Sequence, residues 1–194
     1  YGLVGSEMCI RDSAFTPLAK GMSSEFANAN AYDCIQIHGG SGFMKDYACE
    51  RIYRDARITS IYEGTTQLQV VAAIRHVTTG TYLDWIKSQE ALECLPEDQA
   101  VKEKLQYMTQ QYAAAVETVT GVDNTKYQDL MARRLVEMAG YIIMGYLLLD
   151  DTRRNSQFRT SLNVFVNMGM AKVAEHSSFC LLYTSPSPRD RTRS

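Results

Sequence analysis

The stretch that decides the fold is residues 101–119, VKEKLQYMTQQYAAAVETV. Its apolar residues recur at alternating steps of four and three, which places them along one face of an α-helix and predicts packing in a helical bundle. These residues are Val101, Leu105, Met108, Tyr112, Ala115 and Val119. Pro96, Glu97 and Asp98 predict the helix start, because proline suits the first helical position and acids suit the first turn.

The same helical period appears on both sides of this stretch. Asp123 and Asn124 are candidate caps for a following helix with an apolar face, and a further helix follows from residue 162. Upstream, Thr16 and Pro17 predict a helix start, and His38-Gly39-Gly40-Ser41-Gly42 predicts its end. Because no alternating strand pattern occurs, the sequence predicts an all-α fold: an antiparallel helical bundle followed by a second helical extension.

Composition excludes several classes of protein. The chain has 194 residues, 45% of them hydrophobic and 22% charged, with a formal net charge of −2. The apolar content is too high for intrinsic disorder, and the charge balance argues against a nucleic-acid partner. The longest uncharged apolar stretch, residues 138–149, is shorter than the roughly 20 residues that a membrane span needs.

The two ends of the chain resemble each other at the level of DNA. Residues 180–185, back-translated as TGT CTC TTA TAC ACA TCT, have a reverse complement that encodes residues 7–12 in a shifted frame. Such complementary ends resemble a sequencing adapter read on opposite strands. We therefore expect residues 1–13 and 180–194 to be translated adapter, which leaves an internal piece of a longer protein.

Cysteine and histidine usage favours neither a disulfide framework nor a metal site. Without the two ends, Cys34, Cys49 and Cys94 remain, widely spaced and without a Cys-x-x-Cys pair. For His38 we expect no second ligand at a helpful spacing, so no metal site is predicted. A reducing, cytoplasmic location is the expectation.

Residues 33–69 carry three motifs that occur together. They are IQIHGGSGF at 35–43, ERIYRDARI at 50–58 and IYEGTTQ at 61–67. In this order and spacing they resemble the C-terminal helical domain of the acyl-CoA dehydrogenase family. The resemblance covers residues 14–80, and residues 81–179 resemble the helical extension of longer bacterial members. It implies an FAD-dependent oxidoreductase of the kind used in fatty acid β-oxidation.

Glu63 is the catalytic candidate that the resemblance implies. In the family, the Glu of a Tyr-Glu-Gly-Thr motif removes the α-proton of an acyl-CoA thioester while a hydride leaves the β-carbon for flavin. Such a carboxylate must be more basic than a free Glu, whose pKa is about 4.3, so we expect desolvation around Glu63. Gly64 is the expected substrate-binding residue, because it lacks a side chain and lets the thioester approach the backbone.

Two further segments are expected to contact FAD. Thr65, Thr66 and Gln67 lie at an expected helix start, where free N–H groups and hydroxyls suit a polar cofactor; Thr66 and Gln69 have the spacing of a capping box. The resemblance also implies that a second segment touches the FAD of a neighbouring subunit. Its residues are Gln36, Ile37, His38, Gly39 and Gly40.

This second segment implies a dimer or tetramer. The resemblance further implies an electron-transfer flavoprotein as electron acceptor. Two alternatives stay open from the sequence: a relative of the acyl-CoA oxidases, which return electrons to oxygen, and a non-catalytic helical assembly module that kept the scaffold.

Overall fold

The computed structural model describes residues 2–182, which form helices joined by turns and short connections, with no strand in that range. This confirms the predicted all-α fold. The chain divides into two compact units, residues 1–73 and 74–194. Within the described range, every helix is too short or too polar to cross a membrane.

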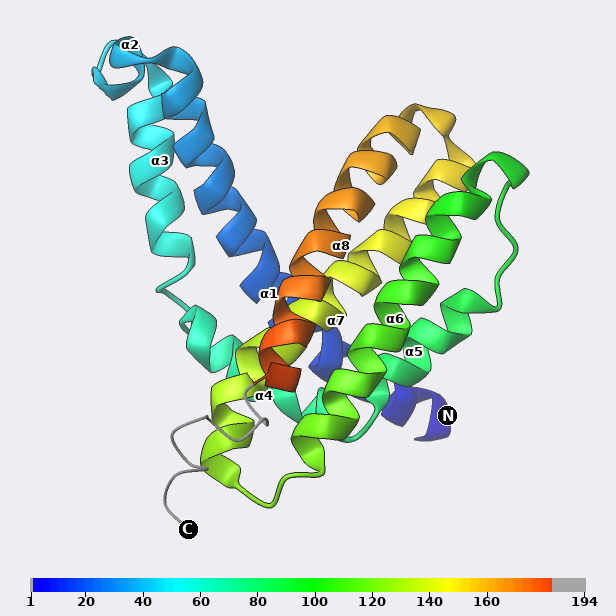
Figure 1. The fold of residues 1–194 in the computed structure, drawn as a ribbon. Coiled ribbons are helices and arrows are strands. Elements are labelled where there is room, and N and C mark those ends of the chain that lie inside the picture. Colours follow the sequence, from blue (N-terminus) through cyan, green and yellow to red (C-terminus); the bar gives the residue numbers. More distant parts are fainter. Residues whose placement is uncertain (1, 183–194) are drawn as a thin grey trace, which may run out of the picture. The chain divides into compact units, whose positions relative to one another are not determined.

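The first unit is a helical hairpin with one further helix. It contains α1 (Gly2–His38), α2 (Gly40–Phe43), α3 (Ala48–Thr59) and the first turns of α4 (Thr66–Thr78). α1 and α3 run antiparallel, side by side, and α2 forms the tip that joins them (Figure 1). α1 ends where the glycine-rich run predicts, because Gly39 adopts a φ of +59°, a conformation that most residues avoid.

The predicted start of this first helix at Thr16 and Pro17 is wrong. α1 begins at Gly2 and includes Pro17 in its interior. Proline lacks the N–H that would bond to the carbonyl one turn earlier, so it weakens a helix there without always ending it. Pro17 and its neighbour Leu18 are both buried.

The second unit contains the longer helices. Its elements are the end of α4, α5 (Thr81–Glu90), the short 3₁₀ helix η1 (Pro96–Asp98), α6 (Gln99–Thr120), α7 (Thr125–Arg154), η2 (Ser156–Phe158) and α8 (Arg159–Leu182). α6, α7 and α8 pack against one another (Figure 1). The six apolar residues predicted to line one face of α6 are all buried, none more than 4% exposed. The periodicity therefore identified the core of this unit.

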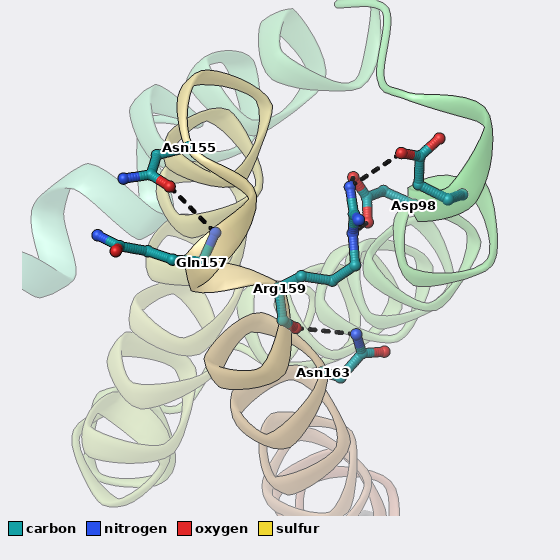
Figure 2. Close-up of polar contacts among 6 residues, drawn as sticks. Asp98, Asn155, Gln157, Arg159 and Asn163 are labelled. Atoms are coloured by element: carbon teal, nitrogen blue, oxygen red, sulfur yellow. Dashed lines mark hydrogen bonds and ion pairs between the residues drawn. The ribbon is translucent and has the colours of Figure 1, made fainter.

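Polar side chains fix the ends of these helices. Asn124, one of the two candidate caps, accepts a hydrogen bond from the backbone N–H of Tyr127, at 3.1 Å, and caps α7. Figure 2 shows how the next connection is held: Asn155 accepts from the N–H of Gln157, and Arg159 at the start of α8 reaches Asp98. Arg159 Nε lies 2.8 Å from Asp98 Oδ1, so the guanidinium pairs with a carboxylate that is only 1% exposed.

The two end segments lie partly outside this description. Residue 1 and residues 183–194 of the expected adapter sequence are outside the described residues. Residues 2–13 form the first turns of α1, and residues 180–182 the last turn of α8. Cys180 is buried, and its carbonyl accepts a hydrogen bond of 3.1 Å from the Tyr127 hydroxyl.

Candidate functional site

Glu63 lies in the tight turn between α3 and α4. The N–H groups of Ile61 and Tyr62 both bond to the carbonyl oxygen of Ile58, at 2.9 and 3.0 Å, and the Thr66 N–H bonds to that of Ser60 at 3.2 Å. Glu63 itself has a φ of +52°, the one positive φ at a non-glycine residue in the described part of the chain. L-residues disfavour this region, and such strained residues concentrate at functional sites.

Lys20 of α1 holds this turn from outside it. Its Nζ donates to the carbonyl oxygen of Thr59 at 2.6 Å and to that of Gly64 at 2.8 Å. The same ammonium lies 5.6 Å from the centre of the Tyr62 ring, within the range of a cation–π contact. The sequence did not single out Lys20, because a lysine on a helix carries no local signal of a partner 44 residues away.

The backbone conformation and the close packing at residue 64 require glycine. It has a φ of +96°, and a Cβ added there would lie 2.6 Å from the amide nitrogen of Gln69. That amide donates to the carbonyl oxygens of Glu63 and Gly64, at 3.4 and 3.3 Å. Gly64 thus lets the first turn of α4 close against the turn that carries Glu63.

The predicted capping box of Thr66 and Gln69 is wrong, because the residue that caps α4 lies one position earlier. Thr65 caps α4, since its hydroxyl accepts from the N–H of Leu68 at 3.3 Å. The Thr66 hydroxyl instead donates to Glu25 of α1, at 2.7 Å. Either of the two adjacent threonines could cap the helix, but the Thr66 hydroxyl is bonded to Glu25, so Thr65 is the cap.

An open groove of about 610 Å³ lies beside this helix start. Thr65, Thr66 and Gln67 line it from α4, and Glu25 and Asn28 line it from α1. Glu63 is exposed and lies next to this lining rather than in it. The structure therefore gathers the three residues predicted near the helix start around one groove, with Glu63 and Gly64 in the adjoining turn.

Asn28 is a groove residue that the sequence did not indicate. Its Nδ2 donates to the carbonyl oxygen of Ser24 at 2.7 Å. Its Oδ1 is buried and has no hydrogen-bond partner among the described residues. Since buried polar atoms are nearly always paired, this acceptor is available to a donor on a bound molecule.

The segment Gln36–Gly40 lies at the opposite end of the hairpin from Glu63 (Figure 1). The 12 residues of α3 lie between these two places, a helix length of about 18 Å. Ile37 is 84% exposed. Around Gly39 and Gly40, no described atom lies within 4 Å of an added Cβ, so the backbone is open to approach. The structure thus separates this segment from the Glu63 turn within one chain.

His38 has neighbours that the sequence analysis did not foresee. Its Nδ1 lies 2.8 Å from the carbonyl oxygen of Cys34 and 3.9 Å from the Cys34 thiol sulfur. Cys49 of α3 also lies close, so the expectation that no second ligand is near His38 is wrong. A spacing of four residues places Cys34 and His38 on one helix face.

Two family models together match nearly all of the chain, residues 6–185. The family model described as acyl-CoA dehydrogenase C-terminal domain matches residues 6–78, and the one described as acyl-CoA dehydrogenase C terminal matches residues 78–185. An acyl-CoA dehydrogenase of Bacillus subtilis (strain 168) is 45% identical over 64 residues, which are 33% of this chain and 17% of that protein. The chain thus aligns with about a sixth of this relative's length.

Solved structures agree with these matches. An acyl-CoA dehydrogenase family protein from Porphyromonas gingivalis is 35% identical, with a TM-score of 0.55 over 60% of this chain and 99% of that one. An acyl-CoA dehydrogenase from Bacillus anthracis, solved with FAD, shares the fold at 18% identity, with a TM-score of 0.73 over 90% of this chain and 34% of that one. These matches show that the chain belongs to the acyl-CoA dehydrogenase family.

Proposed function

We propose that this chain is the C-terminal part of an FAD-dependent enzyme that oxidises an acyl-CoA to the trans-2-enoyl-CoA. The proposal rests on family membership and on one observation in particular. Glu63 occupies a strained backbone conformation in a turn that Lys20 and Gln69 hold in place. A strained acid on a braced turn is the arrangement expected of a group that must be held in position for chemistry.

Glu63 is the proposed catalytic base. Its carboxylate takes the proton from the carbon next to the thioester carbonyl, while the hydride leaves the next carbon and the double bond forms between the two. When bound, the flavin supplies the acceptor for that hydride. The Lys20 hydrogen bond to the Gly64 carbonyl fixes the peptide next to the base, which limits how far the carboxylate can move from the reacting carbon.

The basicity that Glu63 needs depends on removal of water. Glu63 is exposed in this chain, and a carboxylate that is surrounded by water is a weak base. An apolar acyl chain and the other domains of the enzyme would cover this carboxylate and make it a stronger base by removing water from it. The substrate therefore helps to activate the group that reacts with it.

The groove beside α4 fits a polar cofactor. Its volume of about 610 Å³ lies within the range of small-molecule sites. The unpaired Asn28 Oδ1, the hydroxyls of Thr65 and Thr66 and the amide of Gln67 offer both donors and acceptors. The N-terminal turn of α4 adds backbone N–H groups, which favour an anionic or polar segment. We propose that these residues hold part of the FAD.

The segment Gln36–Gly40 is proposed to contact the FAD of a neighbouring subunit. Its separation from Glu63 by the length of α3 supports this, because one chain does not present both segments at the same place. The exposed Ile37 and the open backbone at Gly39 and Gly40 would be covered in the assembly. A dimer or tetramer follows from the proposal, with an electron-transfer flavoprotein as the acceptor of the electrons.

The test is Glu63→Gln in the complete enzyme. Glutamine keeps the size of the side chain but cannot take a proton at neutral pH, so we expect acyl-CoA oxidation with an artificial acceptor to fall by about 10²–10⁴-fold. The yellow flavin should remain bound. Glu93→Gln, at an exposed acid between α5 and α6, is the matched control and should leave the rate unchanged.

Two results would contradict the proposal. An undiminished rate in Glu63→Gln would remove the assigned base. A complete wild-type protein that purifies without flavin would instead favour the non-catalytic assembly module.

A further inference from the structure

Three side chains with soft ligand atoms meet where α1 and α3 pack. Cys34 and His38 lie in the last turns of α1, and Cys49 lies in the first turn of α3. One ligand atom from each, the two sulfurs and a ring nitrogen, lie within 4.8 Å of one another. The set has two thiols and an imidazole, the donor types that zinc prefers.

The fold positions this cluster in two ways. Cys34 and His38 are four residues apart on α1, so both side chains lie on the same helix face. α3 packs antiparallel to α1 (Figure 1), and the Cys49 sulfur lies within 4.8 Å of a ligand atom of both Cys34 and His38. Cys49 is 3% exposed, while Cys34 is half-buried and His38 exposed. The cluster therefore has one ligand fixed in the packed interface and an open side through which an ion can enter.

The distances suit coordination by small side-chain movements. Zn–S bonds of about 2.3 Å and Zn–N bonds of about 2.0 Å in a tetrahedron place neighbouring ligand atoms about 3.5–3.8 Å apart. The Cys34 sulfur lies 3.9 Å from the His38 ring, measured to Nδ1, and one ligand atom from each of the three side chains lies within 4.8 Å of the others. Rotation of the exposed His38 side chain and of the half-buried Cys34 side chain supplies the movement of about 1 Å that coordination needs.

The surroundings of His38 also resemble those of a metal ligand. Its Nδ1 lies 2.8 Å from the Cys34 carbonyl oxygen, and a proton donated there leaves the lone pair on Nε2. Metal-bound histidines usually donate their second ring nitrogen to a carbonyl or carboxylate in this way. The third ligand, Cys49, is held by a hydrogen bond: its thiol donates to the carbonyl oxygen of Gly42, at 3.4 Å.

We propose that Cys34, His38 and Cys49 bind a divalent zinc-class ion. The two thiols lose their protons to solvent on binding, and the resulting thiolates neutralise the charge of the ion. Three protein ligands leave a fourth position for water or for a group from another molecule. The site shares His38 with the segment proposed to contact a neighbouring subunit's FAD, but it does not include Glu63, which lies at the other end of the hairpin, so metal binding by this chain and acyl-CoA oxidation are tested by separate measurements.

The experiment uses the full chain, metal-free and kept reduced, titrated with Co²⁺ as a spectroscopic substitute for Zn²⁺. We expect one equivalent of Co²⁺ to produce the thiolate charge-transfer and tetrahedral d–d absorption bands, and one equivalent of Zn²⁺ to abolish them. Cys34→Ser and Cys49→Ala should remove the bands, and His38→Gln should weaken Co²⁺ binding at least tenfold. Cys94→Ser, at a half-buried cysteine outside the cluster, is the matched control and should bind as the wild type does.

Circular dichroism of each variant separates loss of ligand from loss of fold. Because Cys49 is buried, its variant is also the one that can unfold, and the half-buried Cys34→Ser then decides. Absence of the bands in the reduced wild type would overturn the proposal. So would bands that persist in folded Cys34→Ser or show no dependence on His38. A Cys34–Cys49 disulfide with no metal binding after reduction would point to redox chemistry instead and would equally overturn it.

Discussion

Lys20 Nζ donates a hydrogen bond of 2.8 Å to the carbonyl oxygen of Gly64, a residue 44 positions later in the chain. The same ammonium bonds to the Thr59 carbonyl at 2.6 Å, so one side chain joins α1 to the end of α3 and to the turn before α4. Glu63 lies between these two acceptors in sequence. The position of the proposed base therefore depends on Lys20, a residue that lies outside the three sequence motifs.

Lys20→Met tests this dependence. The methionine keeps the apolar stem but leaves two carbonyl groups without their charged donor, which we expect to cost about 1–3 kcal/mol of the free energy of unfolding. In the complete enzyme, kcat should fall while KM changes little, because the base is displaced and the substrate pocket is not. Lys45→Met, at an exposed lysine in the connection between α2 and α3, is the control. Equal stability and kcat in the two variants would show that Lys20 does not hold the turn.

Gly64→Ala is expected to destabilise the chain. Its φ of +96° is costly for any residue with a Cβ, and that Cβ would meet the Gln69 amide at 2.6 Å. We expect a loss of about 1–3 kcal/mol, measured by urea unfolding. Gly40→Ala is a suitable comparison, because no described atom lies near its added Cβ and its φ is not positive. A Gly64→Ala protein as stable as Gly40→Ala would contradict the assigned role.

Glu63→Gly should have the opposite effect on stability. Glycine adopts a φ of +52° readily, so the substitution relieves the strain at this position. We expect a gain of about 1 kcal/mol in the free energy of unfolding, together with loss of acyl-CoA oxidation in the complete enzyme. Thermal unfolding measures the first effect. A destabilised Glu63→Gly would mean that the residue is held by contacts that favour it rather than kept under strain.

The sequence predicted those features that depend on neighbours along the chain. The face of α6 repeats within a single helix, so Val101 to Val119 were identified as core from spacing alone. The Lys20–Gly64 bond and the meeting of Cys34 with Cys49 depend on how α1 and α3 align, and no local pattern encodes that alignment. The positive φ of Glu63 was equally hidden, because glutamate seldom adopts it.

The core of the second unit contains a hydroxyl whose removal should not weaken the fold. Tyr112 is fully buried, and its hydroxyl has no hydrogen-bond partner among the described residues. Burial also raises the pKa of Tyr112 well above its usual value. Tyr112→Phe removes an unpaired polar group without leaving a cavity, so we expect unchanged or higher stability, by up to about 1 kcal/mol.

Tyr127→Phe is the matched comparison for that experiment. The Tyr127 hydroxyl donates to the Cys180 carbonyl at 3.1 Å, so its removal should cost about 1 kcal/mol. Chemical denaturation of both variants gives the difference. If Tyr112→Phe lost as much stability as Tyr127→Phe, the Tyr112 hydroxyl would have a partner in solution.

Acid should weaken the packing of α7 on α8 through Glu137. Its carboxylate lies 2.7 Å from Arg133 Nε and 2.9 Å from His176 Nε2. Burial alone would raise the pKa of Glu137, but the hydrogen bonds and charges of His176 and Arg133 outweigh it and lower the pKa below the ordinary 4.5. A lowered pKa means that the folded state favours the ionised form, and this stabilisation is lost as the pH falls below 4.5.

Glu137→Gln should therefore be less stable than the wild type near neutral pH and should lose less stability on acidification. Urea unfolding at several pH values down to about 3 measures both effects. Glu103→Gln, at an exposed acid on α6, should leave the pH profile as it is in the wild type. Parallel profiles for wild type and Glu137→Gln would contradict the assignment.

The central claim is that Glu63 removes the substrate's α-proton, and solvent exchange at that carbon measures this step alone. The complete enzyme is incubated in D₂O with an acyl-CoA analogue whose β-carbon cannot release a hydride, and deuterium at the α-carbon is followed by mass spectrometry. The account predicts rapid exchange in the wild type and in Glu93→Gln, and loss of exchange in a flavin-bound Glu63→Gln. Exchange at the wild-type rate in Glu63→Gln would show that another group removes the proton.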